Sequence, residues 1–172
     1  GLMVSDLPAT VAAVSTMLEL EDLALTIDES AYACALPLAK SAMEQILFEL
    51  LENSQKFHPT HRPTVTLAVT LAADGVHMAV ADNGATLSPQ QIKWAMTPYL
   101  QGEKFFTGET PGMGLGLSLV AALVWQVGGG IQINNRLHAS GIVVELRLPA
   151  AVQTQQPATP TMSASPHSAH NR

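Results

Sequence analysis

Three glycines alternate with other residues at Gly112, Gly114 and Gly116, and an apolar stretch follows them from Leu117 to Val120. Glycine lets backbone amides come close to a ligand, because it has no Cβ atom. The first turn of a helix adds unpaired N–H groups and the positive end of the helix dipole. Together these features are typical of a phosphate-binding site, although a glycine-rich turn that merely precedes a helix has the same pattern.

Two other phosphate-binding motifs are excluded at this glycine-rich stretch. A dinucleotide fingerprint requires a strand before the glycines and a further glycine where this chain has Leu117, and the preceding residues 108–111 have the composition of a loop. A P-loop requires Gly-Lys followed by Ser or Thr at its end, which this stretch lacks. The glycines therefore predict phosphate binding only together with residues from elsewhere in the chain.

Glu49, Asn53 and Lys56 lie within a predicted helix, Leu38–Phe57, at spacings that place them on one face. An asparagine oxygen is a suitable ligand for magnesium beside phosphates, and a lysine ammonium meets phosphate as a point charge. A carboxylate beside them can act as a general base. The structural alternatives are an Asn53 amide bonded to a neighbouring loop and ordinary solvated side chains at Glu49 and Lys56.

Asp82 ends a second predicted element, an apolar strand, and is followed by Asn83 and Gly84. A carboxylate at this place can accept a hydrogen bond from an exocyclic amine, and a glycine lets the backbone pass close to a flat base. The alternative is a turn aspartate that bonds its own backbone. Both interpretations are compatible with the sequence.

The elements that must position these residues follow from the apolar periodicity and from the turn residues. Helices are expected at Leu7–Leu20, Leu38–Phe57, Ser88–Met96 and Gly114–Val127. Strands are expected at Leu23–Ile27, Val65–Ala72, Val76–Ala81, Ile131–Asn134 and Gly141–Leu148, with a hairpin turn at Asp74-Gly75. Between the last two helices, Tyr99–Pro111 has the length and composition of a lid loop.

The composition bounds the class of protein. A chain of 172 residues with 47% hydrophobic residues can build one domain, and its net charge of −6 argues against a nucleic-acid partner. The single cysteine, Cys34, excludes an internal disulfide and a cysteine-rich zinc site, and it is expected to be buried. The longest apolar stretch, Leu115–Trp125, is too short to span a bilayer, so we expect a cytoplasmic segment without membrane contact, whose parent protein can still carry an anchor.

Three separated segments, Glu49–Phe57, Asp82–Gly84 and Gly112–Leu117, occur in an order that resembles the GHKL ATP-binding fold of sensor histidine kinases, gyrase B, Hsp90 and MutL. The resemblance is closest to the catalytic, ATP-binding domain of histidine kinases and covers about residues 21–149. It implies an α/β two-layer sandwich (the Bergerat fold), with a mixed, mostly antiparallel sheet and helices on one face. We therefore expect a connector helix or linker remnant at 1–20, the ATP-binding domain at 21–150 and a disordered tail at 151–172.

The same resemblance implies ATP and Mg²⁺ as cofactors. It implies catalytic roles for Glu49 and Lys56, a magnesium ligand at Asn53, and recognition of the adenine amino group by Asp82. The remaining nucleotide-binding residues that it implies are Gly84, Gly112, Gly114, Gly116 and Leu117.

No histidine of the chain fits the role of phosphoacceptor, because none lies beside an acid in a helical pattern. The histidines inside or beside the predicted ATP-binding domain are His58, His61, His77 and His138. The implied partner is therefore a phosphoacceptor histidine domain, in the same parent protein or in trans, with a response regulator downstream. The alternatives are a GHKL ATPase, a protein serine kinase, or a non-catalytic docking domain that binds nucleotide weakly.

Two departures from the family pattern predict weaker nucleotide binding. Thr86 stands where the second glycine of the first glycine box is usual, and Ile142 or Val143 replaces a threonine expected after Gly141. In the predicted lid, Phe105 and Phe106 resemble the aromatic box of histidine kinases, with ordinary loop packing as the alternative. Lys104 beside them can reach phosphate or remain a surface lysine.

Overall fold

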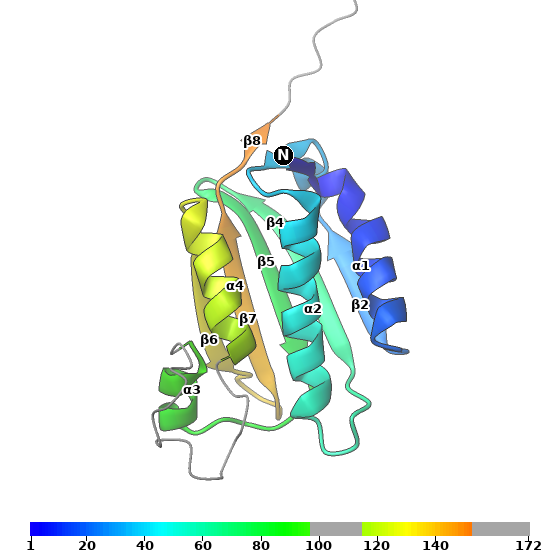
Figure 1. Cartoon of the computed structure of the whole chain (residues 1–172), viewed down its shortest axis with the longest axis vertical. Helices are drawn as coiled ribbons and strands as arrows, with labels where there is room; N and C mark the ends of the chain where they lie inside the picture. The colour runs from blue at the N-terminus through cyan, green and yellow to red at the C-terminus, as the bar shows by residue number, and fades with distance from the viewer. Residues whose placement is uncertain (97–114, 153–172) are drawn as a thin grey trace, which may run out of the picture.

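The computed structural model describes residues 1–96 and 115–152, which form a five-stranded sheet with helices packed on one face (Figure 1). The strand order is β2-β4-β5-β7-β6; β2 pairs parallel with β4, and the other neighbours are antiparallel. The strands are β2 (Leu23–Ile27), β4 (Val65–Ala72), β5 (Gly75–Asp82), β6 (Gly130–Asn135) and β7 (Ile142–Leu148). The predicted α/β two-layer sandwich with a mixed, mostly antiparallel sheet is confirmed.

Three long helices, α1 (Leu7–Met17), α2 (Lys40–Lys56) and α4 (Leu115–Gln126), cover the sheet (Figure 1). Each helix presents one apolar stripe to the core, as the sequence periodicity predicts. On α2, which lies between the other two, the buried residues are Met43, Ile46, Leu47, Leu50, Leu51, Asn53 and Ser54. The apolar stripe therefore fixes the rotation of α2 and carries two polar side chains into the interior at its C-terminal end.

The hairpin of β4 and β5 turns where Asp74-Gly75 predicts a turn. Gly75 has φ +133°, a conformation that residues with a side chain rarely adopt. Along β5 the residues that face the helices are buried, and the alternate residues are only half-buried, so the pleat matches the sequence alternation. The last helix-facing residue of the strand is Asp82, which is carried into the interior at the end of the sheet.

Both ends of the described chain join a second, three-stranded sheet that the sequence did not predict. Its strands are β1 (Leu2–Met3), β3 (Cys34–Leu36) and β8 (Ala151–Val152), in the order β1-β3-β8, and two 3₁₀ turns, η1 (Val4–Asp6) and η2 (Glu29–Ala31), lie nearby. β8 thus takes the first two residues of the segment 151–172, which was expected to be a disordered tail. Cys34 is buried, as expected.

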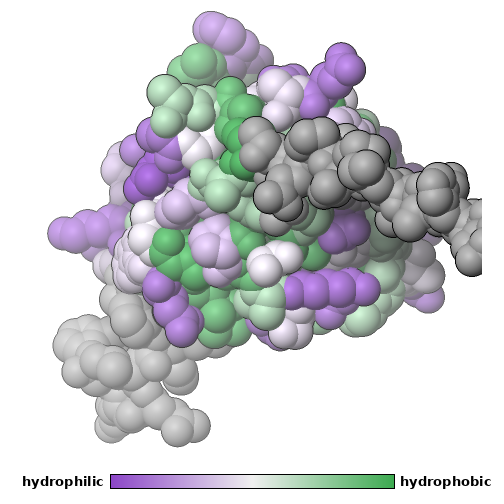
Figure 2. All heavy atoms as spheres, turned by 90° about the horizontal axis from the view of Figure 1, so that it is seen from above, coloured by the Kyte–Doolittle hydropathy of each residue, from purple (hydrophilic) through white to green (hydrophobic). Residues whose placement is uncertain are grey.

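This second sheet lies at the end of the molecule that holds the N-terminus. Hydrophobic and hydrophilic residues are interspersed on the part of that end that Figure 2 shows.

At the same end of the large sheet, the Asp74 carboxylate lies 2.7 Å from His77 Nε2 and 3.7 Å from Arg147 Nε. The hydrogen bond with His77, helped by the Arg147 charge, lowers the pKa of Asp74. The contact of the ionised Asp74 carboxylate with His77 and Arg147 stabilises the fold at neutral pH, and this stabilisation is lost as pH falls through the lowered pKa of Asp74. The stabilisation is small, because these groups are exposed to water.

Candidate functional site

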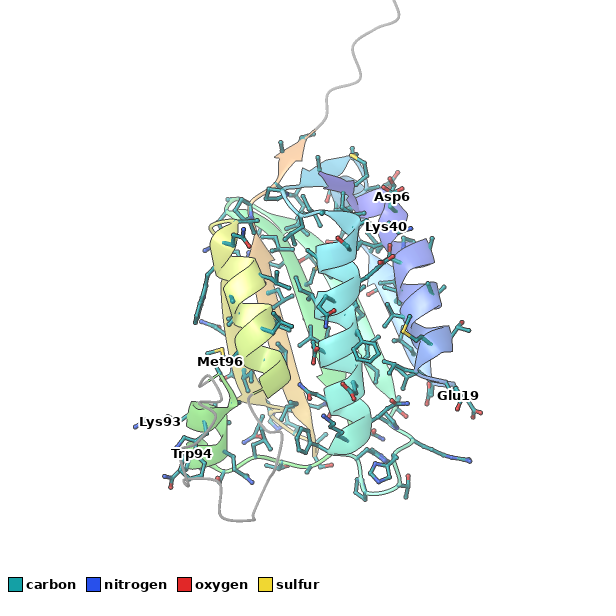
Figure 3. All side chains as sticks on the ribbon, in the orientation of Figure 1. Asp6, Glu19, Lys40, Lys93, Trp94 and Met96 are labelled. Atoms are coloured by element: carbon teal, nitrogen blue, oxygen red, sulfur yellow. The ribbon has the colours of Figure 1, made fainter. Side chains whose placement is uncertain are left out.

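The predicted site residues of the described segments gather at the other end of the large sheet. There α2 ends at Lys56, β5 ends at Asp82 and α4 begins at Leu115 (Figure 1). The short helix α3 (Pro89–Ala95) also lies at this end, with Trp94 on it (Figure 3). Segments that are far apart in the sequence are therefore brought to one place by the packing of α2 and α4 on the sheet.

Asp82 is held by donors from three different parts of the chain. It is 6% exposed, and its Oδ2 accepts a hydrogen bond from the Ser54 hydroxyl at 2.9 Å. Its Oδ1 accepts from the backbone N–H of Gly84 at 2.9 Å and of Ile142 at 3.4 Å. The bond to Gly84 is the local one that a turn aspartate makes, whereas the other two tie the carboxylate to α2 and β7. The carboxylate is consequently fixed in both position and rotation.

Two glycines are required for the close approach of backbone segments around this carboxylate. A Cβ atom at Gly84 would lie 3.2 Å from both the Asp82 Oδ1 and the Phe57 carbonyl oxygen. A Cβ atom at Gly141 would overlap the Asp82 carbonyl oxygen, and Gly141 has φ +108°. Arg136 Nη1 also donates to that carbonyl, at 3.2 Å. Gly84 was predicted as a site residue and Gly141 was not, although a glycine at the start of an apolar strand was its signal in the sequence.

The end of β6 and its connection to β7 hold the loop that follows Asp82. The Asn135 side chain accepts from the Leu87 N–H at 2.9 Å and donates to the Leu87 carbonyl at 2.8 Å. The Ser140 hydroxyl donates to the Gly84 carbonyl at 3.0 Å. These residues were not predicted, because the sequence placed Asn135 just after the strand, where polar side chains are ordinarily solvated, whereas it is the last residue of β6.

We expect Asn135→Ala to destabilise the domain by about 1–3 kcal/mol, because it leaves the N–H and carbonyl of the buried Leu87 without partners. The matched control is Asn134→Ala, since Asn134 is the exposed neighbour on the same strand. Urea denaturation measured by circular dichroism compares the two variants. Equal losses of stability would contradict the anchoring role of Asn135.

The three predicted residues of α2 have different surroundings. The Asn53 side chain is 8% exposed and makes no hydrogen bond within the described part of the chain, so its amide is available to a ligand. The Glu49 side chain is half-buried and its Oε1 accepts a hydrogen bond from Gln45 Nε2 at 2.7 Å. Lys56 is exposed, and its Nζ lies 3.9 Å from Glu52 Oε1. The hydrogen bond between Gln45 and Glu49 lies at the surface of α2, and both interpretations of Glu49 stay open.

The glycine motif is only partly within the described residues. Gly112 and Gly114 lie outside them, while Gly116 belongs to the first turn of α4. Leu117 is buried in the core, so a contact with a ligand would have to come through its backbone. The lid residues at 104–106 also lie outside the described ranges.

The two departures from the family pattern have distinct positions. Thr86 is exposed to solvent, between the anchored residues Gly84 and Leu87. Ile142 is buried and contributes its backbone N–H to Asp82. The expected weakening of nucleotide binding stays a prediction for both positions.

Residues 1–96 and 115–152 were searched for clusters of metal-binding side chains and for membrane-spanning helices. These ranges contain no group of three or more histidine, cysteine or acidic side chains placed to hold a metal ion. A single asparagine oxygen suits magnesium, which commonly keeps water and phosphate oxygens as its other ligands. None of the described helices combines the length and the apolar character that a membrane span needs.

Comparison with known proteins assigns the chain to a protein family. The sequence pattern described as "Histidine kinase-, DNA gyrase B-, and HSP90-like ATPase" matches residues 39–152. The chain therefore belongs to this family, and it is an ATP-binding catalytic domain of the sensor histidine kinase type.

Two relatives that are more than 30% identical to this chain are much longer than it is. The histidine protein kinase DivJ of Caulobacter vibrioides is 37% identical over 123 residues, which are 71% of this chain and 20% of DivJ. The virulence sensor protein BvgS of Bordetella pertussis is 35% identical over 124 residues, which are 69% of this chain and 10% of BvgS. The chain thus spans a fifth or less of these relatives.

Solved structures share the fold at low sequence identity. The catalytic domain of histidine kinase ThkA has a TM-score of 0.65 at 20% identity, over 84% of this chain and 92% of that domain. Full-length ShkA, solved in complex with AMPPNP, has a TM-score of 0.68 at 20% identity, over 90% of this chain and 32% of ShkA. This similarity shows the fold and carries no residue roles.

Proposed function

We propose that this domain binds magnesium–ATP and donates the γ-phosphoryl group to a histidine on a separate phosphoacceptor domain. That domain belongs to the same parent protein or acts in trans, and a response regulator is the next acceptor. The observation that carries the proposal is a fixed carboxylate, Asp82, beside a helix whose Asn53 amide has no hydrogen-bond partner among the described residues. The family membership of the chain supports it.

The residues of the site fit a nucleotide. A side chain at Gly84 would crowd the Asp82 carboxylate and the Phe57 carbonyl, so the glycine keeps the acceptor of the proposed adenine amine in place. Asp82 offers a fixed acceptor for an exocyclic amine, and Asn53 offers an oxygen of the kind that magnesium prefers. Bound magnesium–ATP supplies the phosphoryl group and a cation that neutralises its charge.

The chain's own residues then have separable tasks. Gln45 orients the Glu49 carboxylate, which accepts a proton from the attacking group. Lys56 exchanges its weak, exposed contact with Glu52 for a phosphate oxygen. Gly112, Gly114, Gly116 and Leu117 contribute backbone amides near the beginning of α4, where the helix dipole favours an anion.

The test of nucleotide binding is calorimetric titration of the 172-residue chain with ADP, with and without magnesium. We expect Asn53→Ala to weaken magnesium-dependent binding by about tenfold, which corresponds to about 1.4 kcal/mol, and to leave the melting temperature nearly unchanged. Asn134→Ala, a change of the same kind on an exposed strand position, should leave binding intact. Absence of binding by the unmutated chain at millimolar magnesium–ADP would refute the proposal.

The second candidate function is ATP hydrolysis. It is favoured by the Glu49 carboxylate, which can orient water as readily as an imidazole. Hydrolysis by the unmutated chain, without transfer to a supplied phosphoacceptor domain, would favour this candidate over the kinase.

A further inference from the structure

We propose that two copies of this chain form a dimer through the outer edge of β6 and the flank of α4 beside it. The two large sheets join edge to edge, with β6 of one copy antiparallel to β6 of the other. Trp125, which has no task in the nucleotide site, lies at this interface. The inference goes beyond the proposed function and does not depend on nucleotide binding.

β6 is an edge strand without the usual protection against pairing. It is the last strand of the large sheet, paired with β7 on one side, and among the described residues no strand pairs with its other side. The N–H and carbonyl groups of that side are a template for a further strand. Edge strands are ordinarily blocked by a charged side chain, a proline or a very short length. The six residues of β6, GIQINN, contain neither a charge nor a proline.

α4 exposes large apolar side chains beside this edge. Leu119 is 40% exposed and Trp125 is 57% exposed. With about 3.6 residues per turn, Trp125 lies about a quarter turn from the centre of the buried stripe of the helix. One flank of α4 is packed against α2, so a side chain that is more than half exposed lies on the other flank, toward the edge at β6 (Figure 1). The buried stripe consists of Leu117, Val120, Ala121 and Val124.

The distribution of charge favours a second copy at this edge. Residues 115–135, which comprise α4, β6 and their connection, contain no acidic, basic or histidine residue, although the net charge of the chain is −6. Copies of an acidic chain repel each other where their acids meet, so they can approach closely at an uncharged face, whereas a partner of opposite charge gains nothing there. The opposite edge, at β2, has acids on both sides of the strand: Glu19, Glu21 and Asp22 before it, and Asp28 and Glu29 after it.

A second copy satisfies the open strand and the exposed helix flank together. Antiparallel pairing of β6 with itself follows a two-fold axis perpendicular to the sheet, and this axis keeps the helices of both copies on the same face. The two α4 helices then lie side by side across the axis, and Trp125 of each copy fills the space between them. A single added peptide strand would pair with β6 but would bring no helix to cover Trp125.

The geometry of this dimer leaves both nucleotide sites open. Because the paired strands run in opposite directions, the end of the sheet that holds Asp82 in one copy lies beside the end that holds Asp74 in the other. The two sites therefore face opposite ways along the joined sheet. Association and nucleotide binding can consequently be measured separately.

Sedimentation of the 172-residue chain over a range of concentrations measures the association. We expect a monomer–dimer equilibrium, and Trp125→Glu should raise its dissociation constant by at least about tenfold, because an unpaired charge is then buried at the interface. Gln132→Lys should weaken the dimer as well, because like charges on neighbouring strands repel each other. Gln132 is an exposed β6 residue opposite Glu145 of β7, so the lysine is tolerated within one copy. Circular dichroism checks that both variants fold.

Met17→Glu is the matched control. Met17 is 69% exposed at the end of α1, the helix on the opposite side of the molecule from α4 (Figure 1). The variant adds the same charge at another exposed apolar side chain, so it should leave the association unchanged. Trp125→Glu should bind magnesium–ADP as tightly as the unmutated chain, because its effect is confined to the dimer.

Hydrogen exchange locates the interface: the β6 amides should exchange more slowly in the unmutated dimer than in Trp125→Glu. A chain that is monomeric at every concentration would refute the inference. A dimer that neither Trp125→Glu nor Gln132→Lys weakens would also refute it, because that dimer uses another face. A monomer with all its β6 amides protected would show that another segment of the chain covers the strand, which excludes the dimer. Failure to bind magnesium–ADP would overturn the proposed function and leave the measured association as it is.

Discussion

Gly141→Ala should destabilise the domain by about 2–4 kcal/mol. The first reason is the backbone conformation of Gly141, with φ +108°, which strains any residue that carries a Cβ atom. The second is the overlap of that Cβ atom with the Asp82 carbonyl oxygen, a backbone atom that cannot move without displacing the end of β5. Urea denaturation followed by circular dichroism measures the loss.

Gly128→Ala is the control for this prediction. Gly128 also has a positive φ, +77°, but the nearest atom to an added Cβ would be the Pro149 Cγ at 3.8 Å, an ordinary contact. Its cost should therefore be the conformational part alone, about 1 kcal/mol. Similar losses in the two variants would show that the contact with Asp82 is unimportant. Weaker nucleotide binding by Gly141→Ala is also expected, because the adjoining Ile142 N–H supports the Asp82 carboxylate.

Glu49→Gln should lower phosphoryl transfer by at least about tenfold and leave magnesium–ADP affinity nearly unchanged. A general base acts mainly in the transition state, where it contributes about 10²–10⁴ in rate. The glutamine has the same shape as glutamate and can still accept a hydrogen bond from Gln45, but it cannot take a proton. The measurement is single-turnover transfer from saturating magnesium–ATP to a supplied phosphoacceptor domain.

Glu44→Gln is the matched control on the same helix. Glu44 lies at the other end of α2, with its Oε1 3.8 Å from Lys40 Nζ. Neutralising it should leave transfer unchanged. If Glu49→Gln transfers phosphate as fast as the unmutated chain, Glu49 is not the base. If it instead abolishes nucleotide binding, its role is in the ground state.

Much of the fold could be predicted because local patterns and tertiary packing agree. The apolar stripe of α2 is periodic over its whole length, so the helix was predicted at Leu38–Phe57 and is found at Lys40–Lys56. The alternation of β4 and the turn at Asp74-Gly75 predicted the central hairpin with the same boundaries for β4. Helix and strand periodicity are properties of consecutive residues, and this is why they are visible in a sequence.

The small sheet was missed for a related reason. β1 and β8 have two residues each and β3 has three, which is too few for any periodicity to be recognised. Their pairing brings residue 2 and residue 152 to the same strand, β3. Such contacts depend on where the long elements place the ends of the chain.

By itself, the sequence determined the types of the chemical groups in this protein and their order along the chain: an acid, an amide and a lysine on one helix face, an aspartate at the end of a strand, and glycines before a helix. Only the tertiary structure decided what Asp82 can do. Its partners are the hydroxyl of Ser54, which lies 28 residues away, and the N–H of Ile142, which lies 60 residues away. A serine or an isoleucine carries no local signal that it will serve an aspartate, because a hydrogen bond between distant residues depends on the packing of the helix and strands that carry them.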